Sequence, residues 1–121
     1  MRREMTVLLA VVCLTAGMAR AAEEPPLLAK TPTLGPTAVV FEYGEYLWSV
    51  PRDGGAARQL TTGGHEGAPF FSPDGKWIAF SGMYDGNLDV FVMPAEGGAP
   101  RRLTWHPSPD GAAGWTPDGK K

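Results

Sequence analysis

Residues 46–61 read YLWSVPRDGGAARQLT, and residues 89–104, 43 positions later, read DVFVMPAEGGAPRRLT. The proline, the Gly-Gly pair and the closing Leu-Thr pair keep their places in both copies. A second phrase, SPDGK at residues 72–76, recurs as TPDGK at residues 116–120, displaced by 44. Two separate motifs that share nearly one spacing indicate that the chain is built from a tandem structural repeat.

Within each repeat the pattern predicts short strands. The segments at 37–43 (TAVVFEY), 77–81 (WIAFS) and 89–93 (DVFVM) are rich in Val, Ile and Phe, and glycine, proline or aspartate bounds each of them. This combination is typical of strands. Residues 77–80 are apolar in succession instead of alternating, which predicts a strand that is covered on both faces.

The turns between these strands have a local chemical cause. In SPDG at 72–75, proline presets φ for the first corner of a type I turn, aspartate suits the second, and glycine accepts the left-handed position that follows. This is the pattern of a hairpin turn with a glycine bulge. YDGN at 84–87 and EGG at 96–98 predict two further hairpins.

Four short antiparallel strands in roughly 43 residues have the size of one β-propeller blade. We therefore predict an all-β fold, a partial β-propeller with about one full four-stranded antiparallel blade, near residues 67–105, plus partial blades. Incomplete repeats would occupy residues 37–121 and break off inside a blade, truncated at the C-terminal side. A propeller closes with about four to eight blades, so this chain would supply only the opening arc of a ring.

The N-terminus predicts an export signal of residues 1–21. Arg2 and Arg3 precede an apolar run of 14 residues at 6–19, and the run ends in an Ala-Arg-Ala sequence typical of a cleavage site. The run is too short to span a bilayer as a stable helix. An uncleaved anchor, a twin-arginine signal and a lipoprotein acylated at Cys13 are the alternatives.

Cleavage after Ala21 would leave residues 22–121 without cysteine, and hence without a disulfide, a thiol nucleophile or a cysteine-ligated metal. Residues 22–36 are predicted to be a linker. The leader holds three of the 11 basic and one of the 13 acidic residues, so the remainder has a net charge of about −4. That charge argues against nucleic-acid binding, and no basic amphipathic segment predicts membrane contact after cleavage. The expected location is the periplasm or the exterior.

The segments FSPDGKWIAFSG (71–82), YDGNLDVFVMPAEGGAPRRLT (84–104) and GWTPDGK (114–120) carry a family resemblance. The first two resemble the propeller repeats shared by the TolB translocation protein, the tricorn protease and the prolyl-oligopeptidase relatives. The phrase at 105–120, WHPSPDGAAGWTPDGK, looks most like the first propeller of tricorn-type serine peptidases. A TolB-like protein places an α/β domain before its propeller, and the predicted linker leaves no room for one.

The resemblance implies a non-catalytic N-terminal propeller fragment of an exported tricorn-like serine peptidase. In that family the catalytic serine and histidine lie in later domains, so no catalytic residue is assigned to this chain. The first propeller is regarded there as a gate that admits peptides. The expected partners are peptides or proteins bound by the completed propeller, the remainder of the same polypeptide, and a second copy of the chain. The alternatives are a TolB-like periplasmic interaction module without catalysis and a truncated product without function.

Two groups of residues invite a metal interpretation. His65 and His106 could be read as zinc ligands or as catalytic residues, but they lie about one repeat apart, and we expect them to cap equivalent strand edges or loops. The acidic segment 85–89, together with Glu96, carries oxygen ligands at four positions of a calcium-binding loop. Valine replaces the glycine that the sharp bend of such a loop needs, and a strand is predicted there instead. We therefore assign no metal and no cofactor.

Two other groups invite a catalytic or ligand-stacking interpretation. No serine lies in a Gly-x-Ser-x-Gly elbow and none is paired with a histidine by any motif; the three considered are Ser72, Ser81 and Ser108. We expect Ser72 to open its turn. Four tryptophans could form a stacking platform, but aromatic residues repeated in strands are expected to pack between blades; they are Trp48, Trp77, Trp105 and Trp115.

Overall fold

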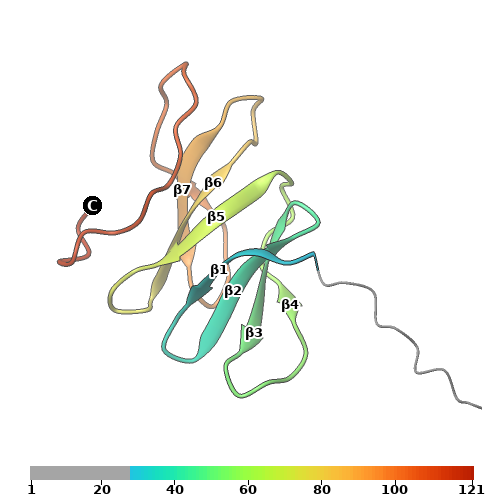
Figure 1. The fold of residues 1–121 in the computed structure, drawn as a ribbon. Helices are drawn as coiled ribbons and strands as arrows, with labels where there is room; N and C mark the ends of the chain where they lie inside the picture. The colour runs from blue at the N-terminus through green and yellow to red at the C-terminus, as the bar shows by residue number, and fades with distance from the viewer. Residues whose placement is uncertain (1–27) are drawn as a thin grey trace, which may run out of the picture.

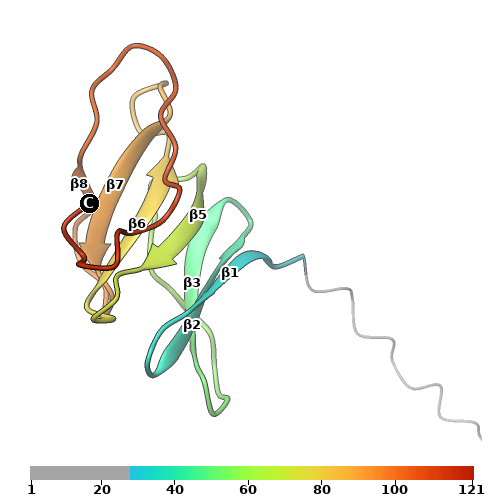
Figure 2. The same cartoon turned by 60° about the vertical axis from the view of Figure 1, so that its left-hand side comes forward.

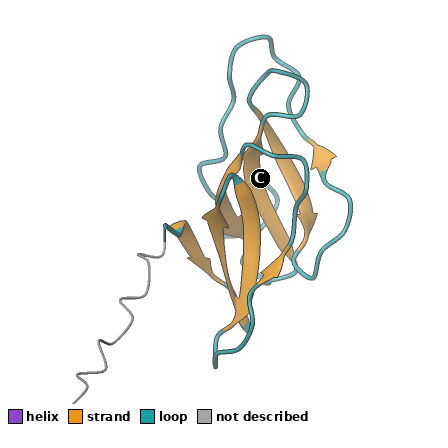
Figure 3. Cartoon of the chain, turned by 90° about the vertical axis from the view of Figure 1, so that its right-hand side faces the viewer, coloured by secondary structure: helices purple, strands orange, loops and turns teal. Residues whose placement is uncertain are grey.

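The computed structural model describes residues 28–121, so the predicted leader and the first part of the predicted linker lie outside the described residues. The described part contains eight strands: β1 (Lys30–Leu34), β2 (Ala38–Tyr43), β3 (Tyr46–Pro51), β4 (Arg58–Gln59), β5 (Glu66–Phe71), β6 (Trp77–Gly82), β7 (Asp89–Pro94) and β8 (Arg101–Arg102). Strands and loops account for all of it (Figure 3). The all-β prediction is confirmed for these residues. No helix in this part is long and apolar enough to cross a membrane.

The strands form two four-stranded antiparallel sheets, β1-β2-β3-β4 and β5-β6-β7-β8, each in sequence order. The prediction of about one full blade was therefore wrong in number, because two sheets of blade size are complete. β1 lies within the segment 22–36 that was predicted to be a linker. Its sequence KTPTL was not predicted as a strand because it lacks the apolar pattern on which strand prediction depends. In the structure, four of its five side chains are exposed.

The predicted turn at 72–76 is confirmed in atomic detail. The amide of Gly75 donates to the carbonyl of Ser72 at 2.8 Å, and Gly75 has a φ of 71°. The Asp74 carboxylate accepts hydrogen bonds from the Ser72 hydroxyl at 2.6 Å and from the Lys76 amide at 3.0 Å. These donors, the hydroxyl first, lower the pKa of Asp74 below its usual value. The turn at 116–120 repeats all three hydrogen bonds at 2.6–3.1 Å.

Each sheet has two chemically different sides, because side chains alternate along a strand. The aromatic face carries two aromatic and two aliphatic residues: Val39, Phe41, Trp48 and Val50 in the first sheet, and Ile78, Phe80, Phe91 and Met93 in the second. The aliphatic face carries smaller residues: Val40, Leu47 and Ser49 in the first sheet, and Ala79, Val90 and Val92 in the second.

The core lies between the aliphatic face of the first sheet and the aromatic face of the second. Val40 and Leu47 belong to one cluster with the four residues of that aromatic face, and every member is at most 7% exposed. The rings of Phe80 and Phe91 stack with their centroids 5.8 Å apart. Burial of each such side chain stabilises the fold by about 1.5–3 kcal/mol, so this junction holds the two sheets together.

The two sheets lie close together at their first strands and far apart at their last strands. β5 contacts β1, β2 and β3, whereas β4 and β8 do not touch each other. Figure 1 shows β5 as the strand of the second sheet that lies nearest the first sheet, with β4 far from β7. Sheets that converge at their first strands and diverge at their last strands are arranged as neighbouring blades around an axis.

The C-terminal segment 103–121 covers the aliphatic face of the second sheet, on the side away from the first (Figure 2). The amide of Ala112 donates to the Ser81 hydroxyl at 2.9 Å. The indole of Trp115 donates to the carbonyl of Phe70, also at 2.9 Å. This segment is thus held on the second sheet by hydrogen bonds.

Its position repeats that of β5 on the first sheet. The amide of Glu66 donates to the carbonyl of Glu45 at 3.0 Å, and the amide of Asp110 donates to the carbonyl of Leu88 at 2.7 Å. Donors and acceptors are displaced by 44 and 43 residues. Residues 110–115 therefore lie where the first strand of a third blade belongs.

Candidate functional site

The junction between the two sheets is closed at one end by a buried carboxylate. Glu66, at the start of β5, is 2% exposed. Its two oxygens accept hydrogen bonds from the hydroxyl of Thr61, at 3.0 Å, and from the phenol of Tyr84, at 2.8 Å. The Thr61 oxygen in turn accepts a hydrogen bond from the amide of Leu47, in β3, at 2.9 Å. This chain of hydrogen bonds joins the first sheet to the second.

The phenol of Tyr84 is held in its neutral form. Burial, and then the hydrogen bond and negative charge of Glu66, raise the pKa of Tyr84 well above its usual value. A neutral phenol keeps the proton that it donates to the carboxylate. The contact between Tyr84 and Glu66 is therefore a structural hydrogen bond.

The second sheet has a corresponding arrangement with a different acid. Asp89 is 2% exposed and accepts a hydrogen bond from the hydroxyl of Thr104 at 3.1 Å. The guanidinium of Arg102 forms an ion pair with its other oxygen. The Thr104 oxygen accepts from the amide of Val90 at 3.0 Å, as Thr61 does from Leu47. The repeated Leu-Thr pair in the sequence indicated the two threonines, but not their carboxylate partners. Asp89 precedes its threonine in the chain, whereas Glu66 follows its own, so the two acids share no common spacing.

A cleft of about 400 Å³ opens beside Glu66 between the sheets. Four residues on its rim have left-handed backbone angles without being glycine, with φ between 45° and 68°; they are Thr31, Glu45, His65 and Ala68. The imidazole of His65 lies 3.1 Å from the carboxylate of Glu45, and both side chains are mostly exposed. Such backbone angles are strained for residues with a Cβ, so the cleft has a rim that the surrounding packing must hold in place.

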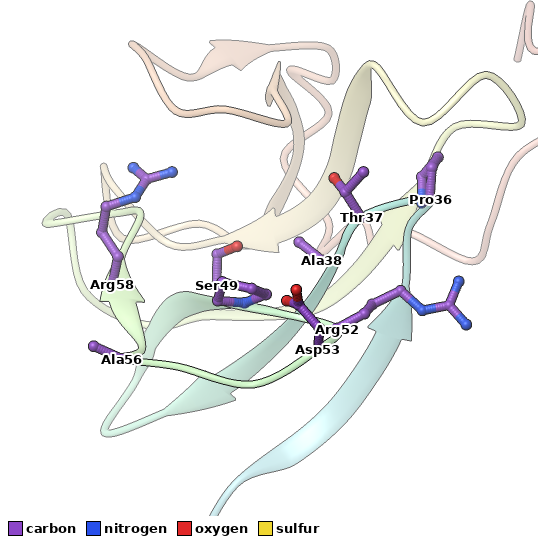
Figure 4. Close-up of a pocket in the computed structure, with 9 residues that line it drawn as sticks. Pro36, Thr37, Ala38, Ser49, Arg52, Asp53, Ala56 and Arg58 are labelled. Atoms are coloured by element: carbon purple, nitrogen blue, oxygen red, sulfur yellow. The ribbon is translucent and has the colours of Figure 1, made fainter.

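A larger pocket of about 720 Å³ is lined by the first sheet and its loops, within residues 36–58 (Figure 4). Arg52, Asp53 and Arg58 are its charged lining residues. Arg52 donates to the carbonyl of Gly35 at 3.4 Å, and Arg58 donates to the carbonyl of Glu96 at 3.0 Å. Both guanidinium groups thus contact backbone carbonyls, and among the described residues neither hydroxyl of the lining, Thr37 or Ser49, is hydrogen-bonded to a carboxylate or a histidine.

The two histidines lie in loops, as expected. His65 precedes β5 and His106 follows β8. The ring nitrogen Nδ1 of His106 accepts a hydrogen bond from the amide of Ser108 at 3.1 Å. Within residues 28–121, no group of three or more His, Cys, Asp or Glu side chains is placed to hold a metal ion.

Three of the four side chains of the calcium-like motif lie around a guanidinium group, because Arg102 forms ion pairs with both Asp85, at 3.6 Å, and Asp89. Asp89 is bonded to Arg102, and the Asn87 amide donates to Asp89 at 3.4 Å and to the carbonyl of His106 at 2.9 Å. The extended strand β7 places Glu96 beyond the other end of the sheet. The hairpin interpretation of these residues is the one that fits the structure.

The serines have structural partners. The Ser72 hydroxyl accepts a hydrogen bond from the amide of Trp77 at 3.0 Å and so closes its turn. The Ser81 hydroxyl accepts from Ala112, as described above, and Ser108 is exposed. Among the described residues, none of these hydroxyls forms a hydrogen bond with a histidine, so the geometry provides no nucleophile–base pair.

The tryptophans do not gather into a platform, and the expectation of packing between blades holds for only part of them. The indole of Trp115 lies on the second sheet, but Trp77 is 43% exposed and Trp105 is 69% exposed. Trp105 stacks at 6.0 Å from the guanidinium of Arg102. Trp48 lies on the aromatic face of the first sheet and donates to the carbonyl of Tyr43 at 3.1 Å.

Comparisons with known proteins agree with this geometry. The chain is 37% identical over 84 residues to "Tricorn protease homolog 1" of Streptomyces coelicolor, an alignment that covers 68% of this chain and 8% of that protein. The tricorn protease structure superposes with a TM-score of 0.65 and 24% identity over 78% of this chain and 10% of that chain. A TolB candidate from Agrobacterium tumefaciens gives a TM-score of 0.66 and 26% identity over 79% and 37%.

The chain thus spans a small part of the relatives that it resembles. Residues 26–121, most of the sequence, match the family described as the tricorn protease N-terminal β-propeller domain. A domain of this kind begins with neighbouring blades, as the two sheets are, and continues with a third blade, whose first strand corresponds to residues 110–115. The chain belongs to the family of tricorn protease N-terminal β-propeller domains.

Proposed function

We propose that this chain is the opening part of a propeller in an exported tricorn-like serine peptidase, and that the completed propeller binds or gates peptides. The observation that carries the proposal is the family membership of residues 26–121 together with the continued stacking of residues 110–115. Catalysis is assigned to other parts of the intact protein, because residues 28–121 bring together no nucleophile and base.

The convergence of the two sheets at their first strands supports a channel lined by those strands. β1 and β5 lie at the edge where the sheets converge, which is the axial side of a propeller. The strained rim at Thr31 and Ala68 belongs to these two strands, each at a bulge in its pairing. A peptide that passes along the axis would meet these strands, whereas β4 and β8 would lie at the periphery.

Peptide hydrolysis by the intact protein tests the gating role. Lys30→Glu reverses a charge on β1, and Arg58→Glu makes the same reversal on β4 at the opposite edge of the sheet. We expect Lys30→Glu to change kcat/KM for a long unfolded peptide several-fold while leaving a short chromogenic peptide unaffected. Equal effects of the two variants on the long peptide would contradict an axial path.

Export is a separate part of the proposal and rests on the sequence of residues 1–21. Expression with the native N-terminus, followed by cell fractionation and mass spectrometry, tests it directly. We expect a processed chain that begins at Ala22 in the periplasm or the medium. An intact N-terminus in the cytoplasmic fraction would remove the export proposal without affecting the fold.

A TolB-like interaction module is the second candidate. The 26% identity and 79% coverage shared with the TolB candidate favour it. The DNA downstream of the Lys121 codon separates the two candidates. Further blades followed by a catalytic serine domain favour the peptidase, and an end after the last blade favours the interaction module.

A further inference from the structure

The first strands of the two sheets carry the same irregularity. In β1, residues 31–32 (Thr-Pro) lie together opposite the single residue Phe41 of β2. In β5, residues 68–69 (Ala-Pro) lie together opposite the single residue Phe80 of β6. Two residues against one is the arrangement of a β-bulge. These two X-Pro bulges, residues 31–32 and 68–69, therefore occupy the same place in neighbouring blades.

The backbone of both X-Pro bulges is held in an unfavourable conformation. Thr31 has a φ of 45° and Ala68 a φ of 48°, in the left-handed region. The residue before a proline prefers extended angles, and a residue with a Cβ is strained at a left-handed angle. The Thr31 hydroxyl donates to Glu42 at 3.4 Å, but Ala68 has no polar side chain that could act in the same way. The two blades thus share the shape of the backbone and not a side-chain contact.

Each X-Pro bulge contains an amide that can accept a hydrogen bond but cannot donate one. A proline nitrogen carries no hydrogen, so the peptide units at 31–32 and 68–69 have only their carbonyl groups to offer. No amide of a turn or loop within residues 28–121 donates to either carbonyl. Proline also cannot donate to the ladder of hydrogen bonds between strands, which keeps each bulge in place.

The X-Pro bulges lie on the side of the sheets that faces the axis of a completed propeller. β1 and β5 are the first strands of their sheets and contact each other (Figure 1). Thr31 and Ala68 both line the cleft of about 400 Å³, so one open space adjoins both bulges. Residues 112–113 hold the corresponding place in the third blade but have neither a proline nor a left-handed angle. The irregularity therefore marks one stretch of the axial wall, at the first two blades.

An extended polypeptide is the ligand that suits this surface. Its main chain carries a row of N–H donors, and binding through main-chain hydrogen bonds requires no particular side chain. We propose that the X-Pro bulges of β1 and β5 bind the main chain of an unfolded peptide at the wall of the axial channel. This contact rests on the proposed function and deepens it, because the propeller would then select for extended backbone and not for sequence.

Photo-crosslinking on the intact protein tests the contact without requiring catalysis. Benzoylphenylalanine is placed at Thr31, which is exposed, and as a control at Ala56 in the exposed β3–β4 loop. We expect position 31, but not position 56, to capture a long biotinylated unfolded peptide. A scrambled sequence should be captured equally well, whereas the same peptide methylated on its main-chain nitrogens should be captured several-fold less. Equal capture at both positions, or no loss on methylation, would overturn the proposal.

Peptide hydrolysis separates this contact from the gate itself. Pro32→Ala with Pro69→Ala restores an N–H to each bulge, and should raise KM for the long peptide several-fold while kcat and the hydrolysis of a short chromogenic peptide stay unchanged. The control, Pro107→Ala with Pro109→Ala in the exposed loop after β8, should behave like the wild type. If Lys30→Glu affects the long peptide and the bulge variant does not, the gate stands and the bulge contact is wrong. If the bulge variant unfolds by circular dichroism, capture at position 31 decides.

Discussion

Removal of the Glu66 carboxylate is expected to weaken the junction between the two sheets. In Glu66→Ala, the hydroxyls of Thr61 and Tyr84 both lose their acceptor. Thr61 is 3% exposed, so water cannot replace the lost oxygen there, whereas Tyr84 is 36% exposed and its phenol can turn toward solvent. The amide of Leu47 keeps its bond to Thr61, which is left with an unpaired proton.

The magnitude follows from these exposures. A hydrogen bond to a charged group contributes about 1.5–3 kcal/mol, and a buried donor left without a partner loses most of that amount. Counting Thr61 fully and Tyr84 in part, we expect the free energy of unfolding to fall by about 2–4 kcal/mol. Glu66→Gln retains one acceptor oxygen and should lose roughly half as much.

Urea unfolding followed by circular dichroism measures this change. The measurement is made at low protein concentration, so that any association between copies does not contribute to stability. Glu45→Ala, which removes a carboxylate that is 65% exposed, is the matched control and should stay within about 0.5 kcal/mol of its parent. A loss of less than about 1 kcal/mol in Glu66→Ala would refute the idea that this carboxylate joins the sheets.

Three further outcomes are expected. Phe80→Ala, at a fully buried core position, should lower the free energy of unfolding by about 3–5 kcal/mol in the same urea assay; a loss below 1 kcal/mol would mean that the sheets do not pack as described. Gly75→Ala should lower the free energy of unfolding by at least about 2 kcal/mol, because the new Cβ would lie 2.4 Å from a proline ring. Gly86→Ala should lower it by only about 1 kcal/mol, because nothing lies within 4 Å of its Cβ and only the left-handed backbone strain remains. Equal shifts in melting temperature would contradict this steric argument. Tyr84 has a raised pKa in the folded state, so the contribution of its phenol to folding stability is complete below pH 10.0 and is lost as the pH rises above that value. Tyr84→Phe should therefore flatten the alkaline decline in melting temperature. If the variant keeps the alkaline slope of the wild type, the contact with Glu66 does not contribute as described.

The turn residues show why local structure could be predicted so closely. The Ser-Pro-Asp-Gly-Lys turn forms between β5 and β6, and its copy at 116–120 forms where no strand of the described chain follows it. Proline, aspartate and glycine impose this conformation through their own φ preferences and a side chain that bonds the adjacent backbone. Such a turn needs nothing from the rest of the molecule.

The first strand shows the opposite case. Lys30–Leu34 pairs with β2 because an unpaired edge of that strand is available, not because KTPTL has strand character. The burial of Glu66 and Asp89 could not be predicted either: nothing in the sequence marks Glu66, and Asp89 stands out only as part of the calcium-like motif. Their burial depends on hydroxyl and guanidinium groups brought from other elements, and no spacing in the sequence announces those partners.

The sequence by itself determined the repeat and the alternation of strands and turns, since both follow from residue types that act over a few neighbouring positions. Tertiary structure decided which faces are covered, which acids are buried and which tryptophans remain exposed. The aromatic faces of the two sheets have nearly the same chemistry, yet among the described residues one is buried and the other is only partly buried. The physical reason is that burial belongs to a pair of surfaces, and a surface finds its partner only when the chain, or a second chain, brings that partner against it.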